Sequence, residues 1–253
     1  MRFRLLIFLT LSLVTILPVI VLAMWVVSDA QNKENEIIAD KHLVIARNLS
    51  KALDLYSFDL KNGFELIAKM RHTNEHSYPI STFMKSLNFV HFCIADLKSG
   101  VVVNAIAPKN LPCPKKVPPK RFRDFVNLLE EGRVAFSPLM MNPRGIPTLY
   151  LLKAYDNKLV IGAVATDYIV QQGNSVSFGQ KGHSAIVDQI GQVISHPLPA
   201  WRKSKKDIRK IPPVQRMVAR KTGTMAFYSP ALKADMVTGY SFVPTTGYHS
   251  PKA

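Results

Sequence analysis

The chain has 253 residues, of which 47% are hydrophobic, so it is long enough to bury one sizeable core or two small ones. It contains no P-loop, no glycine-rich dinucleotide motif, no H-E-x-x-H metal motif and no cysteine spacing typical of zinc sites, which excludes the enzyme classes that depend on them. The formal net charge of +16 favours anionic partners such as acidic lipids or acidic ligands. Because the basic residues are spread along the chain, a generally basic surface is the simpler interpretation, and we expect no nucleic-acid partner.

An uncharged apolar run occupies residues 5–27. As a helix it would span roughly 34 Å, enough to cross the hydrocarbon core of a membrane. Two arginines lie in residues 1–4, which the positive-inside bias places in the cytoplasm, so everything after residue 27 would be exported. The alternative is a signal peptide cleaved near residues 28–30, but the run is longer than the apolar region that such peptides usually have. A retained transmembrane helix is therefore the favoured interpretation.

Residues 28–77 are predicted to form one long helix that continues from this span. Apolar residues recur there three or four apart, as expected for one packed face of a helix. They are Ile38, Val44, Ile45, Leu49, Leu53, Tyr56, Leu60, Phe64 and Ile67. A helix of about 45 residues would reach about 65 Å, so it must lie along a globular body or pair with a second chain as a dimer. Tyr78-Pro79 is expected to end it, because proline cannot continue a helix.

After the helix, the pattern changes to short strands separated by turn residues. A first hairpin is predicted at 89–95 and 101–107, followed by a proline-rich loop, a helix at 121–131 and three strands at 134–139, 146–155 and 159–168. This order indicates an antiparallel sheet of the α+β class with its helices on one side.

The same order of elements then begins again. A second hairpin is predicted at 184–188 and 192–196, then a helix near 214–220 and strands at 224–229 and 236–243. Asp96 and Asp188 occupy equivalent turn positions, and so do Gly100 and Gly191. We expect each Asp to accept backbone N–H bonds and each Gly to supply a positive φ, so these residues have structural roles. The repeat predicts two tandem modules, 78–170 and 171–247, with an atypical tail at 248–253.

Two cysteines lie on the exported side of the predicted span, where a disulfide could persist. Cys93 is placed in a strand and Cys113 in the proline-rich loop. A bond between them would close an excursion of about 20 residues. Two free thiols, one of them buried, are the alternative.

These residues together resemble the double-Cache family of bacterial transmembrane receptors. The resemblance covers roughly residues 30–247, and its clearest part is the second module. The matching segments are FGQKGHSAIVDQIGQVISHP at 178–197, Phe227-Tyr228-Ser229-Pro230-Ala231 and Thr246-Gly247, with Arg123-Asp124-Phe125, Phe136-Ser137 and Ile161-Gly162 to Asp167 in the first module. The fold that this resemblance implies is α+β, with an N-terminal transmembrane helix, a long helix and two tandem PAS-like antiparallel five-stranded sheets.

The function that the resemblance implies is sensing. Family members sit in the bacterial inner membrane and bind amino acids, carboxylates or amines in the periplasm, usually in the membrane-distal module and without a cofactor. They relay the signal to a kinase, a diguanylate cyclase or a chemotaxis output. After Gly247 the family would continue with a last strand, a second membrane helix and the output domain, whereas this sequence departs from that pattern.

The resemblance also predicts ligand-binding residues in the first module. Arg123 matches the position that binds a ligand carboxylate, and Asp167 matches the acid that holds the ligand ammonium. Phe125 stands where amino-acid-binding relatives place Trp, so that motif is only partly present. An amino acid, another small organic molecule and no ligand at all stay open as alternatives.

Three further residues complete the predicted site. Arg121 lies on the same helix as Arg123, and Lys153 lies on a strand face where it could meet an anionic ligand or extend to solvent. Tyr150 lies on the opposite face of that strand and could belong to the core.

Enzymatic and metal-binding alternatives are weak. His183, Ser184 and Asp188 contain the residue types of a hydrolase triad, but no G-x-S-x-G motif surrounds the serine. His72 and His76 could share a helical face, but no third metal ligand is evident. The alternative function from a different class is a membrane-anchored basic protein that binds an anionic polymer or lipid without a small-molecule pocket.

Overall fold

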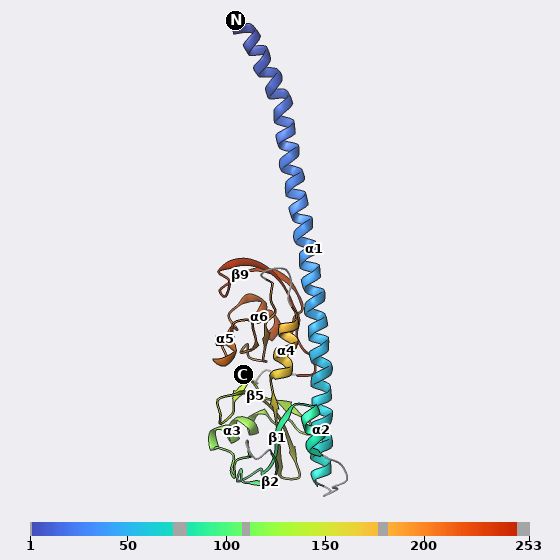
Figure 1. Cartoon of the computed structure of the whole chain (residues 1–253), viewed down its shortest axis with the longest axis vertical. Helices are drawn as coiled ribbons and strands as arrows, with labels where there is room; N and C mark the ends of the chain where they lie inside the picture. Colours follow the sequence, from blue (N-terminus) through green and yellow to red (C-terminus); the bar gives the residue numbers. More distant parts are fainter. Residues whose placement is uncertain (1, 73–79, 108–111, 177–181, 247–253) are drawn as a thin grey trace.

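The computed structural model describes residues 2–72, 80–107, 112–176 and 182–246. Its most prominent element is the helix α1, Arg2–His72, a single rod of 71 residues that extends far beyond the globular body (Figure 1). The predicted membrane span and the predicted long helix are therefore one continuous element, with Pro18 inside it. Within α1 a stretch is long and apolar enough to cross a membrane, and none of that stretch is buried by the rest of the chain. The predicted helix end at Tyr78-Pro79 lies outside the described residues.

The C-terminal half of α1 packs on the body through the predicted apolar face. Leu53, Leu60, Phe64 and Ile67 are buried there. Val44 was expected on this face but is 55% exposed. At about 100° per residue it points roughly 170° away from the middle of the face formed by these four residues, so it projects to solvent.

The first of the two modules, which we call the distal module, is built on a six-stranded antiparallel sheet. In this sheet the last strand, β6, lies between β1 and β5. Its strands are β1 Phe89–Asp96, β2 Val102–Ile106, β3 Ala135–Phe136, β4 Met140–Met141, β5 Pro147–Tyr155 and β6 Lys158–Ala165. The single strand predicted at 134–139 is divided into β3 and β4. The division falls at Pro138, which cannot donate a hydrogen bond to a strand ladder.

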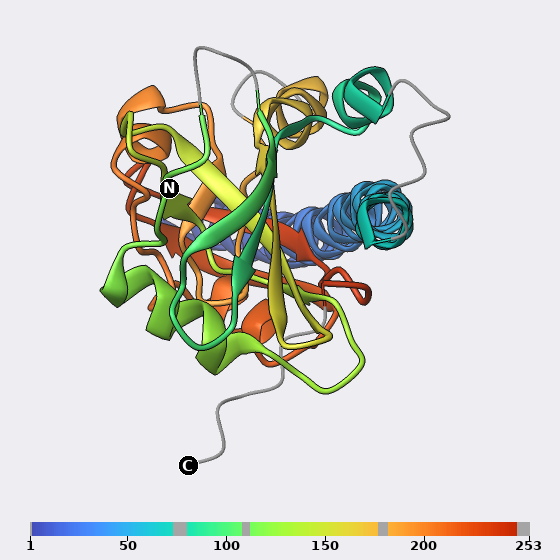
Figure 2. The same ribbon diagram turned by 90° about the horizontal axis from the view of Figure 1, so that it is seen from below.

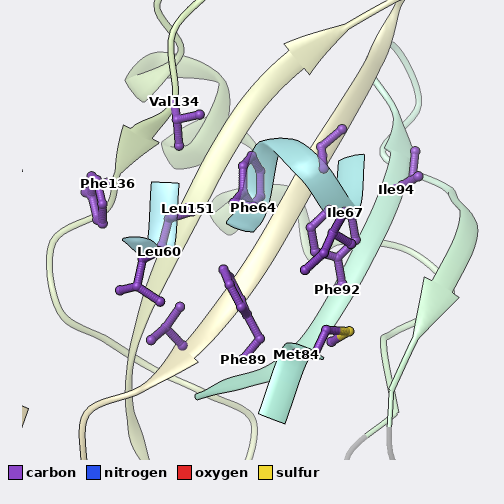
Figure 3. Packing of buried hydrophobic residues seen from close by; sticks show 12 residues of the cluster. Leu60, Phe64, Ile67, Met84, Phe89, Phe92, Ile94, Val134, Phe136 and Leu151 are labelled. Carbon is purple, nitrogen blue, oxygen red and sulfur yellow. The ribbon is translucent and has the colours of Figure 1, made fainter. Parts of the chain in front are cut away.

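Helices cover both faces of this sheet, which corrects the prediction that they would lie on one side. The helices α1 and α2, Ile80–Ser86, pack on one face, where Phe64 and Ile67 meet Phe89 and Phe92 (Figure 3). The helix α3, Pro119–Leu128, covers the other face, and Figure 2 shows the sheet between α1 and α3. Burial on both faces explains why β5 and β6 are nearly continuous hydrophobic runs instead of alternating ones.

The second module, which we call the proximal module, repeats the hairpin of the distal module but does not form a continuous sheet. The described strands pair as two separate ribbons, β7–β8 and β9–β10, so the predicted five-stranded sheet is not formed by these residues. The elements from the end of the distal module onward are α4 Asp167–Ser175, β7 Ile186–Val187, β8 Val193–Ser195, α5 Pro199–Lys203, α6 Pro212–Val218, β9 Gly223–Ser229 and β10 Ala234–Tyr240. The predicted turn chemistry is confirmed. The Asp96 and Asp188 carboxylates accept backbone N–H bonds, and Gly100 and Gly191 have φ of 69° and 86°.

Both modules rest on the same rod. The strand β10 lies against α1 so closely that a Cβ on Gly239 would come within 2.3 Å of the His42 backbone. The His42 Nδ1 atom is 2.9 Å from the Val237 carbonyl oxygen, and the Asp54 carboxylate accepts the Thr245 N–H at 2.6 Å. The α+β class and the tandem arrangement along one helix are thereby confirmed.

Candidate functional site

Three of the predicted ligand-binding residues meet beneath α3. Arg121 Nη1 lies 3.4 Å from the Tyr150 hydroxyl, and its guanidinium carbon lies 5.6 Å from the centre of the Tyr150 ring. The Phe125 and Tyr150 rings are 5.1 Å apart, and both side chains are almost fully buried. Arg121 Nη2 also donates to the Met141 carbonyl oxygen at 2.6 Å. The α3 helix therefore places one cationic group over an aromatic floor supplied by β5.

The other three predicted residues lie elsewhere. Arg123 is exposed on α3, because it follows Arg121 by two residues and so points to nearly the opposite side of the helix. Lys153 lies on the face toward α1, where its Nζ atom is 3.1 Å from Glu65 Oε1. Asp167 was expected to end the last strand, but it is the exposed first residue of α4. Arg123 lies on α3, which covers the distal sheet, whereas Asp167 begins α4, which packs against α1 and the β7–β8 ribbon, so the structure does not bring them together as a pair.

His91, which was not among the predicted site residues, also belongs to this distal site. Its side chain is 7% exposed, its ring centre is 6.4 Å from that of Tyr150, and its Nδ1 atom has no hydrogen-bond partner among the described residues. Burial, with a smaller contribution from the Arg121 charge, lowers the pKa of His91 to about 4. An imidazole inside the apolar run FVHFCIA was the sequence signal that could have identified it.

The two cysteines form a disulfide at the edge of the same cluster. The bond settles the choice left open by the sequence. It connects Cys93 of β1, which is buried beside the α3 core, to Cys113 in the segment that leads into α3. The disulfide thus fixes the approach of α3 to the sheet and, with it, the position of Arg121.

The charge of this cluster is unbalanced. No Asp or Glu in the described part of the chain forms an ion pair with Arg121. Burial raises the pKa of Tyr150, although Arg121 opposes this rise, so the phenol stays protonated at neutral pH. A half-buried guanidinium with only neutral partners favours a carboxylate or another small anion.

A second candidate site is a cavity of about 320 Å³ between α1 and the proximal module. Leu49 and Leu53 of α1 line it from one side, Ile186 and Ile194 from the first ribbon, and Val237 from the second. Its walls are mainly aliphatic and aromatic, and its volume is at the lower end of the range for small-molecule pockets. Tyr240 of β10 also lines this cavity, whereas Asp235 of the same strand is exposed.

The apparent triad residues of the second hairpin have structural contacts. Asp188 Oδ1 accepts the N–H groups of Ile190 and Gln192, and its Oδ2 accepts the Leu139 N–H at 2.8 Å. The Ser184 hydroxyl donates to the Gly173 carbonyl oxygen at 2.6 Å. Asp188 therefore holds the second hairpin together and joins it to the distal module. His76, one member of the considered histidine pair, lies outside the described residues.

The buried histidines predict that the folded state is less stable in mild acid. His196 is 3% exposed, and burial followed by the nearby His183 and Arg202 charges lowers its pKa to about 4. Its Nδ1 atom accepts the Leu198 N–H, so protonation would remove that bond. Because the folded pKa is below the unfolded one, the stability is present above about pH 6.5 and decreases as the pH falls toward 4.

We expect roughly 2 kcal/mol of unfolding free energy to be lost for each such histidine between pH 7 and pH 5. The raised pKa of Asp188, caused by burial, acts in the opposite direction as its carboxyl takes up a proton. Unfolding midpoints of the wild type and of His196→Gln at several pH values measure the contribution. The unfolding midpoint should decrease less between pH 7 and pH 5 in the variant than in the wild type. Equal decreases in the two proteins would contradict the assignment.

Comparison with known proteins gives no matching family model and no matching curated protein. Solved structures are similar. The ligand-binding domain of the Campylobacter jejuni chemoreceptor Tlp3, in complexes with 4-methylisoleucine and with L-norvaline, is 10% identical, and the match covers 80% of this chain and 85% of that chain with a TM-score of 0.55. The ligand-binding domain of the Pseudomonas aeruginosa PAO1 amino-acid chemoreceptor PctB, in complex with L-Gln, is 17% identical over 76% of this chain and 79% of that chain, with a TM-score of 0.47. The likeness to the Tlp3 domain shows the fold.

Proposed function

Since the chain has the double-Cache sensor fold, we propose that it is the extracytoplasmic sensing region of a membrane-anchored receptor that binds a small organic acid in its distal module. The single observation that supports this proposal is Arg121, a half-buried cation over Tyr150 with no acidic partner among the described residues. The solved domain of similar fold from Campylobacter jejuni was determined with amino-acid ligands, and a carboxylate is the group that such ligands share with organic acids.

The distal site offers a partner for the carboxylate of a ligand but not for the ammonium group of an amino acid. A guanidinium can bind both oxygens of a carboxylate through two parallel N–H bonds. Arg121 has neutral oxygen partners from Tyr150 and Met141, which a carboxylate could replace. Asp167, the predicted ammonium partner, is exposed on another element. A carboxylic acid without a required ammonium group is therefore the ligand class that the cluster fits best.

The long helix supplies the route for the signal. The apolar part of α1 would anchor the chain in a bacterial inner membrane, with the residues after 27 in the periplasm. The Lys153–Glu65 ion pair and the buried Phe64 connect the distal sheet to the same helix. A ligand that binds one arrangement of sheet and helix more tightly would shift the population toward that arrangement.

The exposed side of α1 is a candidate dimer surface. Five large apolar residues outside the membrane span are about half exposed there, namely Ile37, Val44, Leu55, Phe58 and Leu66. At about 100° per residue, they fall within a sector of roughly 80°, away from the face that packs on the body. Apolar residues that share one side of a long helix fit pairing with the same side of a second copy, as parallel helices from one membrane would allow.

A thermal-shift screen tests the proposed function. The full chain in lipid nanodiscs is heated with carboxylic acids, amino acids and amines in turn. A ligand at 100 times its Kd adds about 2.7 kcal/mol of stability, which raises Tm by roughly 5–10 °C in a domain of this size. We expect this increase with an organic acid and its loss in Arg121→Gln.

Arg123→Gln is the matched control, because it removes the same charge from the exposed side of the same helix. It should retain the full increase in Tm. If both variants retain it, Arg121 does not hold the ligand. If no small molecule acts and only polyanions bind, with an affinity that falls steeply with salt, the anionic-polymer alternative replaces the sensor.

A further inference from the structure

The proximal cavity lies where the two ribbons of the proximal module do not join into one sheet. In the distal module, β6 pairs with both β1 and β5 and so closes the space between them. In the proximal module the equivalent ribbons β7–β8 and β9–β10 do not pair with each other in the described part of the chain. The cavity lies between these ribbons, with α1 as its third wall.

The walls of the cavity are mainly apolar, with a cationic side chain at the surface; the one carboxylate among the described lining residues, that of Asp188, already accepts three backbone N–H bonds. Aliphatic side chains from α1 and from both ribbons form the body. Arg220, an exposed residue, also lines the cavity, with its guanidinium 5.0 Å from the centre of the Phe242 ring and one nitrogen 3.4 Å from the Pro244 carbonyl oxygen. None of the ion pairs within the described ranges involves Arg220. An apolar interior with an unpaired cation at its surface fits a molecule that has an apolar part and an acidic group.

We propose that this cavity is a second ligand site, which binds a small amphipathic organic acid with its hydrocarbon part among the aliphatic walls and its carboxylate at Arg220. The volume of about 320 Å³ accommodates one short chain or ring and not a two-chain lipid. The site is separate from the Arg121 cluster of the distal module, so either site can be present without the other.

The position of the cavity gives the ligand direct access to the rod. Leu49 and Leu53 line the cavity on α1, between the apolar span and the distal contact at Phe64. The β10 backbone touches α1 at Gly239, and Val237 and Gly239 also line the cavity. A ligand between β10 and α1 therefore acts on the same helix as the distal site, but nearer the membrane.

Fluorescence quenching by brominated acids tests this proposal. The chain has two tryptophans, Trp25 in the apolar span and Trp201 on the cavity wall. In the full chain carrying Trp25→Phe, in lipid nanodiscs, Trp201 is the only tryptophan that 8-bromooctanoate can quench. We expect saturable quenching, with a Kd that falls about fourfold for each methylene added between 4-bromobutanoate and 8-bromooctanoate, as burial of that group predicts.

Two pairs of variants separate the hydrocarbon and carboxylate parts of the proposal. Ala46→Leu narrows the cavity from α1 and should abolish the quenching, whereas Ala52→Leu, on the same helix but not on the wall, should retain it. Arg220→Gln should lower the affinity for 8-bromooctanoate about fivefold and leave the affinity for 8-bromooctanol unchanged. Arg216→Gln, at an exposed residue, should change neither affinity.

Each other outcome overturns a defined part. Quenching that does not saturate, or that persists in Ala46→Leu while far-UV circular dichroism and the Trp201 emission without ligand are unchanged, would show that the cavity is not a site. Equal affinities for the acid and the alcohol would overturn the role of Arg220. Quenching only by vesicles of brominated phospholipid would assign the surface to membrane lipid instead of a free acid. Loss of quenching in Arg121→Gln would show that the acid binds the distal site.

Discussion

Replacing Phe64 by Ala is expected to lower the free energy of unfolding by about 3–5 kcal/mol and the Tm by roughly 10 °C. Phe64 is fully buried, with its ring centre 5.3 Å from that of Phe92 and 6.5 Å from that of Phe89. Truncation would leave a cavity between α1 and the distal sheet, because the strands cannot collapse onto a rigid helix. Thermal unfolding of the full chain in detergent micelles measures the loss.

Phe58→Ala is the matched control for this prediction, since the same truncation is made on the same helix at a side chain that is 53% exposed. Because Phe58 belongs to the candidate dimer surface, the two variants are compared at a concentration where the chain is monomeric, and there Phe58→Ala should change the stability by less than about 1 kcal/mol. Similar losses in the two variants would show that α1 does not pack on the sheet as described. Gly162 gives a second check, because a Cβ there would lie 2.8 Å from Phe64 Cδ2. Gly162→Ala should therefore destabilise the wild type more than it destabilises Phe64→Ala.

The repeated hairpin could be predicted from the sequence because its information is local. Asp96 and Asp188 bind backbone N–H groups within a few residues, and Gly100 and Gly191 have positive φ. Turn chemistry of this kind depends only on neighbours in the chain. The same holds for α1, whose packed face has a clear helical period over many turns.

The binding residues were harder to predict because the phase of a short helix decides which side chain points inward. The helix α3 begins at Pro119, which suits a first helical position. Arg121 and Phe125 are four residues apart and share the buried face, whereas Arg123 faces solvent. A motif match selects a residue by its place in the sequence, and a difference of two residues on a helix turns the side chain to nearly the opposite side.

Long-range pairing was the other information that the sequence lacked. The residues of β5 and β6 alternate between a core against α1 and a core against α3, and a hydrophobic run alone does not show which helix covers which face. Likewise, the strands of the second module were predicted individually, but their failure to join into one sheet depends on contacts between ribbons. The cavity that results has no local sequence signal.

Removing the Cys93–Cys113 disulfide is expected to lower the free energy of unfolding by about 3 kcal/mol, close to the chain-entropy value for a loop of 20 residues. The Tm should fall by roughly 6–12 °C in Cys113→Ser, measured by thermal unfolding of the full chain. The bond also holds the segment before α3 against β1, so we expect the variant to lose affinity at the Arg121 site as well as stability.

Chemical reduction tests the contribution of the disulfide bond separately from that of the Cys113 side chain. A thiol reductant should lower the Tm of the wild type to that of Cys113→Ser and should not lower the Tm of the variant further. Because Cys93 is buried in the core beneath α3, its free thiol would still fill the same space, so the difference reports the crosslink and not a packing defect. A wild type with the same Tm before and after complete reduction would show that the folded contacts alone position α3. In that case the disulfide would not be what fixes Arg121 over Tyr150.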